Sequence, residues 1–374
     1  MKYCKNCLSP DTRPGGYFDN GMCLPCNYLT THTNTNYPVQ LELLREVYRS
    51  SRKGQKNKGA YDCIVGVSGG KDSSRQAQWV RDRLGLRPLL ISVAYPPKQM
   101  SPIGAWNLSN LIEMGFDIIT VTPAPDSSRR LSKECFYKFG NVSKASEKAL
   151  YSTVPRIAID LGINTIFWGE NDAIQVGEKT VQGKDEFDGN KLRHMNTISA
   201  GGDEWIHELV GTEKGEHYVY PNEFEFEKQK INVFFLGPAW DDWSNSNNAT
   251  YGALHGLTLR PGEENTTGDI SNASMLDEEF TNINMMIKYY KFGFGRTTDI
   301  VNESIRLGEI TREEGIRLVE NYDGVCDDTI IDSYCKYIGI TSEDFWSVVH
   351  SYTNRNLFDI VSGINRPKRK FSIG

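Results

Sequence analysis

The chain has 374 residues, of which 39% are hydrophobic and 24% charged, so it can form a core and is not a disordered chain. At roughly 150 residues per domain, this length favours two to three domains. The formal net charge is −6, and the acidic middle of the chain argues against a long nucleic-acid footprint. The sequence has no apolar run long enough to span a bilayer, and Met1 to Cys4 does not begin a signal sequence, so we expect a cytoplasmic protein.

Four of the eight cysteines fall in the first 26 residues, with the spacing C-x2-C-x15-C-x2-C: Cys4, Cys7, Cys23 and Cys26. Disulfides are rare in reducing compartments, and two such pairs are typical of a zinc ion bound by four thiolates. Such a site has no open position, so the metal would be structural. Four reduced cysteines, or a redox pair, are the alternative. We predict a zinc ribbon over residues 1–35, too small to hold a core without its metal.

Residues 36–59 are predicted to form a linker and a helix, because apolar residues recur at helical spacing from Leu41 to Tyr48. Strands and helices then alternate over residues 60–180. The predicted strands are 62–67, 88–95, 117–121 and 165–168, and the predicted helices are 72–84, 102–114, 127–139 and 143–161. This alternation predicts an α/β fold with a doubly wound parallel sheet.

The remainder of the chain divides by composition. Residues 181–275 are rich in Gly, Asn and aromatic residues, and we predict an irregular, substrate-facing region with a strand near 232–236. Residues 276–374 are predicted to be helical, and Thr311 to Glu314 has the pattern of a capping box.

The first predicted strand, which ends at Val67, leads directly into Ser68-Gly69-Gly70-Lys71-Asp72-Ser73. This run lacks the spacing of the Walker loop and of the dinucleotide fingerprint. Its glycines let the backbone turn tightly against an anion, while backbone N–H groups and the start of the next helix hold phosphates. Serine hydroxyls and the charge of Lys71 complete a phosphate site at the carboxyl end of the strand. A glycine turn that opens an ordinary helix is the alternative.

This loop resembles the SGGxDS PP-loop of the ATP pyrophosphatases, which have the adenine nucleotide α-hydrolase-like fold. The resemblance implies ATP, with Asp72 as a Mg²⁺ ligand. It places Gly169 and Glu170, which follow the fourth strand, at the same rim, with Glu170 as a second Mg²⁺ ligand or, alternatively, in a surface turn. Ser92 and Val93 end the second strand, where the adenine of the family lies.

The PP-loop enzymes share one chemistry, in which a substrate carbonyl oxygen attacks the α-phosphorus of ATP and pyrophosphate leaves. A nitrogen or sulfur nucleophile then displaces AMP. Sulfur would mean a PP-loop tRNA thiolase, which usually needs active-site cysteines. The cysteines outside the ribbon have no CxxC spacing: Cys63, Cys135, Cys326 and Cys335. We therefore predict amidation of a small molecule and keep the thiolase as the alternative.

Nearly the whole chain resembles the N-acetyl sugar amidotransferases of bacterial surface-glycan biosynthesis, the WbpG-like and PseA-like proteins. The resemblance rests on the ribbon, the glycine loop, residues 168–171, the run IKYYKFGFGRTTD at 287–299 and residues 308–314. It implies conversion of an acetamido group on a nucleotide-activated sugar to an acetamidino group, through an adenylated intermediate. The product would serve lipopolysaccharide (O-antigen) or glycan biosynthesis.

The resemblance also implies ammonia from a glutaminase subunit that resembles the histidine-pathway one, with a cyclase-like barrel subunit beside it. Lys2 stands where an N-terminal glutaminase would have its cysteine, so we expect ammonia to come from a partner or from free ammonium. Lys291 and Arg296 are predicted to be catalytic residues that bind substrate phosphates or stabilise the adenylate, with Lys288 nearby. A basic helix end is the alternative.

Two further features have no assigned role. Residues 240–243, Trp-Asp-Asp-Trp, have the composition either of a sugar-stacking site or of an ordinary aromatic loop. His194 and His207 lack the spacing of a metal site or a catalytic triad, so we expect structural or surface roles for both.

Overall fold

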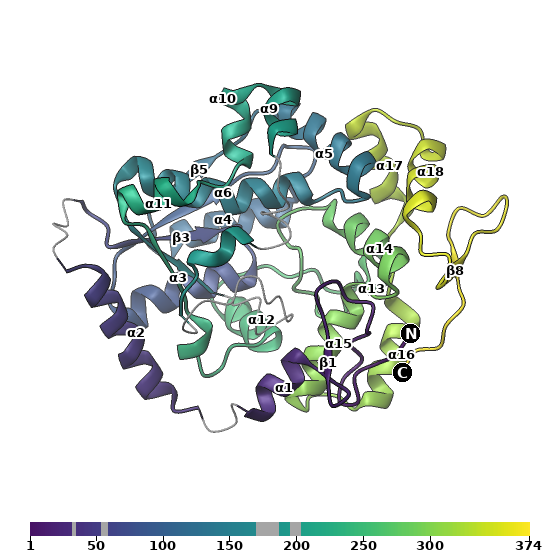
Figure 1. The fold of residues 1–374 in the computed structure, drawn as a ribbon, viewed down its shortest axis with the longest axis horizontal. Coiled ribbons are helices and arrows are strands. Elements are labelled where there is room, and N and C mark those ends of the chain that lie inside the picture. Colours follow the sequence, from purple (N-terminus) through teal and green to yellow (C-terminus); the bar gives the residue numbers. More distant parts are fainter. Residues whose placement is uncertain (32–34, 54–58, 170–186, 195–202) are drawn as a thin grey trace.

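The fold is taken from a computed structural model, which describes residues 1–31, 35–53, 59–169, 187–194 and 203–374. Figure 1 shows the sheet and its helices on the left, and the C-terminal helices with the N-terminal segment on the right. No helix among the described residues is both long and apolar enough to cross a bilayer.

The main sheet is parallel throughout and has five strands in the order β5-β4-β3-β6-β7. The strands are β3 (Cys63–Val67), β4 (Pro88–Val93), β5 (Ile118–Val121), β6 (Thr165–Trp168) and β7 (Asn232–Phe235). The prediction of an α/β fold with a parallel sheet is therefore confirmed. The chain builds outward from β3 in one direction through β4 and then in the other through β6. Strand order thus reverses beside β3, and ligands bind at such a point in open α/β sheets.

Helices cover both faces of this sheet, which explains why its strands are apolar without alternation. Val65 faces a cluster that includes Leu44 and Leu111, whereas its neighbour Ile64 faces a cluster that includes Val154. The helices of this layer are α2 (Tyr37–Ser51), α3 (Lys71–Leu84), α4 (Pro102–Glu113), α5 (Pro125–Phe139) and α6 (Lys144–Leu161). All five were predicted, with ends within a few residues of those observed.

The described part of residues 181–275 is more regular than predicted. It contains the short helices η2 (Asn190–His194), α9 (Glu204–Val210), α10 (Thr212–Gly215), η3 (Glu216–Tyr218), α11 (Glu223–Gln229), η4 (Gly237–Ala239), α12 (Asn245–Leu254) and α13 (Glu264–Thr267). Strand β7 confirms the strand that was predicted near residues 232–236, and it forms an edge of the main sheet. Helix α12 packs on α3, where the Tyr251 hydroxyl donates to Gln78 at 2.9 Å. These helices are short, so most of them span too few turns to show a clear apolar period.

The C-terminal region is helical, as predicted. It contains α14 (Thr281–Phe292), α15 (Arg296–Leu307), α16 (Arg312–Tyr322), α17 (Asp328–Ile338), α18 (Ser342–Tyr352) and the hairpin of β8 (Phe358–Asp359) and β9 (Lys368–Arg369). The capping box of Thr311 and Glu314 begins α16. Phe136 of α5 stacks on Phe345 of α18, so α5 belongs to the cores of both parts of the molecule.

The cysteine-rich segment packs against the C-terminal helices and not against the sheet. It consists of β1 (Phe18–Asp19), β2 (Met22–Cys23) and α1 (Leu24–Thr31). Leu8 is fully buried against Val301 of α15 and Val319 of α16, and its N–H donates to the Asn302 side chain at 2.7 Å. The Arg312 guanidinium donates to the Cys7 carbonyl at 2.6 Å. The two ends of the chain thus form one packed unit, as Figure 1 shows for β1, α15 and α16.

Leu8→Ala should destabilise the protein by about 2–5 kcal/mol, the usual range for removing a buried leucine, because the cavity lies at the junction of segment and helices. Urea unfolding followed by circular dichroism measures this loss. The control is Leu43→Ala on the exposed side of α2, with an expected change within about 0.5 kcal/mol. Equal effects of the two substitutions would contradict docking of the segment.

Candidate functional site

The glycine loop lies where β3 ends, and its shape requires glycine. Gly69 has φ of +87°, and a Cβ atom there would lie 2.9 Å from the carbonyl oxygen of Gly104 in α4. Gly104 is equally constrained, since its own Cβ would lie 2.5 Å from the Cα of Asp277. Three backbones therefore stack in contact: the loop, the first turn of α4, and the segment before α14. This stacking brings residues about 200 positions apart to one place.

Hydrogen bonds within the loop hold it in a tight turn. The Gly70 N–H donates to the Ser68 hydroxyl at 3.4 Å, and the Ser73 hydroxyl donates to the Gly70 carbonyl at 3.2 Å. Gly70 is the N-cap of α3, and no side chain among the described residues caps this helix. The first-turn N–H groups, at the positive end of the helix dipole, are therefore left for an anion.

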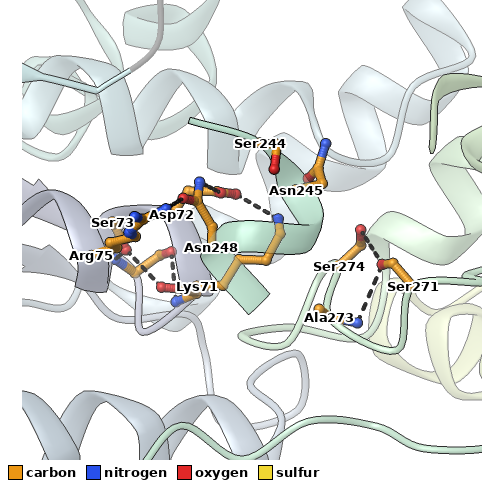
Figure 2. A network of polar contacts seen from close by, with 12 residues as sticks. Lys71, Asp72, Ser73, Arg75, Ser244, Asn245, Asn248, Ser271, Ala273 and Ser274 are labelled. Atoms are coloured by element: carbon orange, nitrogen blue, oxygen red, sulfur yellow. Dashed lines mark hydrogen bonds and ion pairs between the residues drawn. The ribbon is translucent and has the colours of Figure 1, made fainter. Parts of the chain in front are cut away.

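Lys71 and Asp72 form the charged centre of the site (Figure 2). The Lys71 Nζ lies 2.6 Å from Asp72 Oδ2, and Lys71 is buried. The Asn248 amide of α12 donates to the other carboxylate oxygen at 2.6 Å, and Arg75 donates to Asn248 at 2.7 Å. Asp72 is thus oriented from two sides. Asn248 was not predicted, because nothing in its polar surroundings distinguishes it.

A cavity of about 620 Å³ opens above this loop. Its lining includes the polar residues of the loop with Asp277 and Lys288, and the apolar residues Val93, Val154 and Trp168. The volume and this mixture of apolar and polar groups suit a nucleotide. The predicted residues that line it are Val67, Ser68, Gly70, Lys71, Asp72, Ser73, Val93 and Gly169.

Two predicted nucleotide-binding residues lie behind this lining. Gly69 supports the loop through its contact with α4. Ser92 is buried, while its neighbours Ile91 and Val93 line the cavity, because successive side chains of a strand point to opposite faces. Glu170, predicted as a Mg²⁺ ligand, lies outside the described residues, immediately after Gly169.

Asp277 and Glu278 are buried acids that the sequence analysis missed. Asp277 lines the cavity, accepts from the Tyr95 hydroxyl at 3.3 Å, and also bonds Ser68 of the loop. Burial raises the pKa of Asp277 above its usual value. Burial and the adjacent Asp277 raise the pKa of Glu278 to about 8. In the sequence, these two residues appear only as part of an acidic run before a helix. Such a run usually consists of exposed acids that cap the helix N-terminus.

The three predicted basic residues separate in the structure. Lys288 lines the nucleotide cavity and pairs with Asp299, and burial lowers the pKa of Lys288. The Lys291 ammonium donates to the Phe139 carbonyl at the end of α5, at 2.8 Å, and lies outside the cavity lining. This contact is a helix-end interaction, and the catalytic role of Lys291 stays a prediction. Arg296 lines a second cavity, described below.

The tryptophans at 240 and 243 have different surroundings. Trp240 is buried and stacks on Trp79 of α3, with ring centroids 5.1 Å apart, so it belongs to the core beside that helix. Trp243 lines the nucleotide cavity. Among the described residues, His194 and His207 belong to no metal-ligating group.

The four predicted cysteines come together as a buried group, with sulfur atoms all within 4.8 Å of one another. Cys4 and Cys26 are 3.7 Å apart, and Cys7 and Cys23 are 3.6 Å apart, measured between sulfur atoms. A zinc ion with Zn–S bonds of about 2.3 Å requires tetrahedral sulfur separations of about 3.8 Å. The group therefore fits zinc.

Neighbouring donors also suit thiolate ligands. The backbone N–H of Cys23 points to Cys4 sulfur at 3.3 Å, and that of Ser9 points to Cys7 sulfur at 3.4 Å. The Asn6 amide donates to Cys26 sulfur at 3.4 Å. Such outer hydrogen bonds orient the ligands and stabilise their negative charge.

Residues 275–368 match the family model for the LPS biosynthesis protein WbpG-like, C-terminal domain. This C-terminal part is therefore similar to that domain, and we refer to residues 275–368 as the WbpG-like domain. The match covers the KFGFGR run and so confirms the resemblance to the WbpG-like family. No curated protein matches the chain. The WbpG-like domain begins two residues before Asp277, so it supplies both Asp277 and Lys288 to the nucleotide cavity.

Purified protein should contain one tightly bound zinc per chain, and Cys23→Ser should lower that content, since three thiolates hold the metal less tightly. Elemental analysis after dialysis measures it. Cys335→Ser, which changes a buried cysteine outside the group, should retain the zinc. Metal-free protein that is folded and fully stable would refute the ribbon.

Glu278 should make stability depend on pH. Because folding raises the pKa of Glu278 from about 4.5 to about 8, its contribution is fully present below pH 4.5 and is lost as the pH rises through 8. Wild-type melting temperature should therefore fall more steeply over this window than that of Glu278→Gln. The exposed control Glu113→Gln should follow the wild-type slope. Parallel curves for wild type and Glu278→Gln would show that Glu278 does not titrate there.

Proposed function

We propose that this chain is an ATP-dependent N-acetyl sugar amidotransferase, a carbon–nitrogen ligase that forms AMP and pyrophosphate. It would convert the acetamido group of a nucleotide-activated sugar to an acetamidino group in the cytoplasm, for O-antigen or related glycan biosynthesis. One observation carries the proposal: the WbpG-like domain and the glycine loop line the same cavity, the domain through Asp277 and Lys288 and the loop through Lys71 and Asp72.

The polar residues of the cavity would bind the phosphates of ATP, and its apolar residues would bind the adenine. The loop N–H groups, the serine hydroxyls and Lys71 would bind the phosphates. The apolar wall beside Val93 and Val154 would receive the adenine. Asp72, an oxygen donor held by Lys71 and Asn248, fits a Mg²⁺ ion, which would neutralise phosphate charge. Glu170 remains the proposed second ligand.

The proposed reaction has two steps. The acetamido oxygen of the sugar attacks the α-phosphorus, the bond to the bridging oxygen breaks, and pyrophosphate leaves. Ammonia then adds to the activated carbon, loses protons, and displaces AMP, which leaves the amidine. The protein supplies position and charge for both steps, with Lys71 and Lys288 near the phosphates.

The cysteines of the described chain favour amidation over thiolation. Cys63, Cys135, Cys326 and Cys335 are all buried, and none lines the nucleotide cavity. Burial raises the pKa of Cys135 and Cys326 to about 12, so neither is a reactive thiolate at neutral pH. We therefore propose ammonia as the nucleophile, delivered by a partner glutaminase, with a cyclase-like subunit, or taken from free ammonium.

Asp72→Asn and Lys71→Ala should each lower AMP formation by about 100-fold or more, because each removes a charge aimed at the triphosphate. The assay contains ATP, Mg²⁺, ammonium and acetamido nucleotide sugars, with AMP and pyrophosphate measured by chromatography. The matched control is Asp82→Asn, an exposed residue on the same helix that pairs with Arg81, and its rate should equal that of wild type. ADP as the product would overturn the PP-loop assignment, and sulfur transfer to tRNA would favour the thiolase.

A further inference from the structure

A second cavity, of about 430 Å³, lies between the cysteine-rich segment and α15. One wall is α15 from Arg296 to Leu307, and another is formed by Pro25, Tyr28 and Leu29 of α1. The cavity meets the nucleotide cavity at residues that line both: Lys71, Asp72, Trp243 and Met275. A molecule bound here therefore reaches the reacting end of the nucleotide site.

The carboxylates that line this second cavity already have partners. Asp299 pairs with Arg13 and Lys288, and the resulting charge stabilisation lowers the pKa of Asp299. Glu303 accepts from the backbone N–H of Asn245 at 2.9 Å. Asp72 is held by Lys71 and Asn248, as described above. Among the described residues, none of these three carboxylates forms an ion pair with Arg296 or Arg306.

Two arginines in the same lining lack such partners. The Nε of Arg296 is buried and has no hydrogen-bond partner, and no side-chain hydrogen bond or ion pair joins Arg296 or Arg306 to another described residue. A guanidinium that has no carboxylate partner is suited to bind a phosphate in a bidentate manner. The two residues are ten positions apart on α15, or about 15 Å along its axis. A ligand that contacts both must therefore be elongated, which a single phosphate ion is not.

We propose that the second cavity binds the acceptor as a phosphate-bearing nucleotide sugar, with Arg296 and Arg306 contacting its anionic nucleotide portion. This inference rests on the proposed function, since it assigns the acceptor of that reaction. The acetamido end would lie at the shared residues Lys71 and Asp72, beside the α-phosphorus. Aromatic side chains of the lining, Tyr28, Tyr37 and Trp243, offer faces for a sugar or a base.

The same geometry gives the cysteine group a function beyond stability. Cys26 lies on α1 one turn before Leu29, and Tyr28 and Leu29 line the cavity. A metal that holds Cys26 thus fixes the position of this wall. The ribbon would be a wall of the acceptor site, although its metal takes no part in the chemistry.

The test is a calorimetric titration of zinc-loaded protein, with the nucleotide cavity first saturated by α,β-methylene-ATP and Mg²⁺. The probe is UDP-N-acetylglucosamine. Arg296→Gln and Arg306→Gln should each raise its Kd about tenfold or more, and Arg296→Lys should restore part of the affinity because charge returns without the planar fork. Arg49→Gln, an exposed arginine on α2, is the control and should bind as wild type.

Affinity for α,β-methylene-ATP and the melting temperature should be unchanged in every variant, which separates acceptor binding from folding. Unchanged affinity for UDP-N-acetylglucosamine in both glutamine variants, or no binding to wild type, would overturn the proposal. The reaction is tested separately. AMP formation that does not depend on these arginines would refute the acceptor site alone, whereas arginine-dependent binding without AMP formation would refute the proposed function alone.

Discussion

The backbone contact from Gly69 through Gly104 to Asp277 is the constraint on which the candidate site depends. A Cβ at either glycine would collide with the next backbone, at 2.9 Å for Gly69 and 2.5 Å for Gly104. The contact sets the glycine loop at the end of β3 and brings the start of the WbpG-like domain beside it. Lys71 and Asp72 directly follow the two glycines and begin α3, so the same backbone contact also fixes their positions. Nucleotide binding and the C-terminal domain are therefore parts of one structure.

The two cavities gather basic side chains, although the surrounding sequence is acidic. The middle of the chain is acidic, yet Lys71, Lys288 and Arg296 converge on two joined cavities. The acids there are either paired, like Asp299, or buried beside another acid, like Asp277. Pairing removes their charge from competition, and burial disfavours their ionisation. The result is a site suited to polyphosphates inside a protein of net negative charge.

The cysteine-rich segment connects the two ends of the chain to this site. Leu8 and Cys7 bond residues of α15 and α16, and α1 continues from the cysteine group to the second cavity. A segment of this size has little core of its own, so its order depends on the metal and on the helices it contacts. Loss of zinc is thus expected to affect α15 and the cavity that α15 lines.

Residue patterns within short stretches of the sequence determined many of the structural elements of this protein. The spacing of Cys4 to Cys26, the strand–loop–helix at Ser68–Ser73 and the alternating strands and helices were all predictable, because each depends on residues near one another in sequence. Only the tertiary structure decided that Asp277, 209 positions after Ser68, bonds the loop, that Asn248 orients Asp72, and that Lys291 contacts the end of a helix. Those contacts arise from packing between distant elements, which leaves no period or spacing in the sequence.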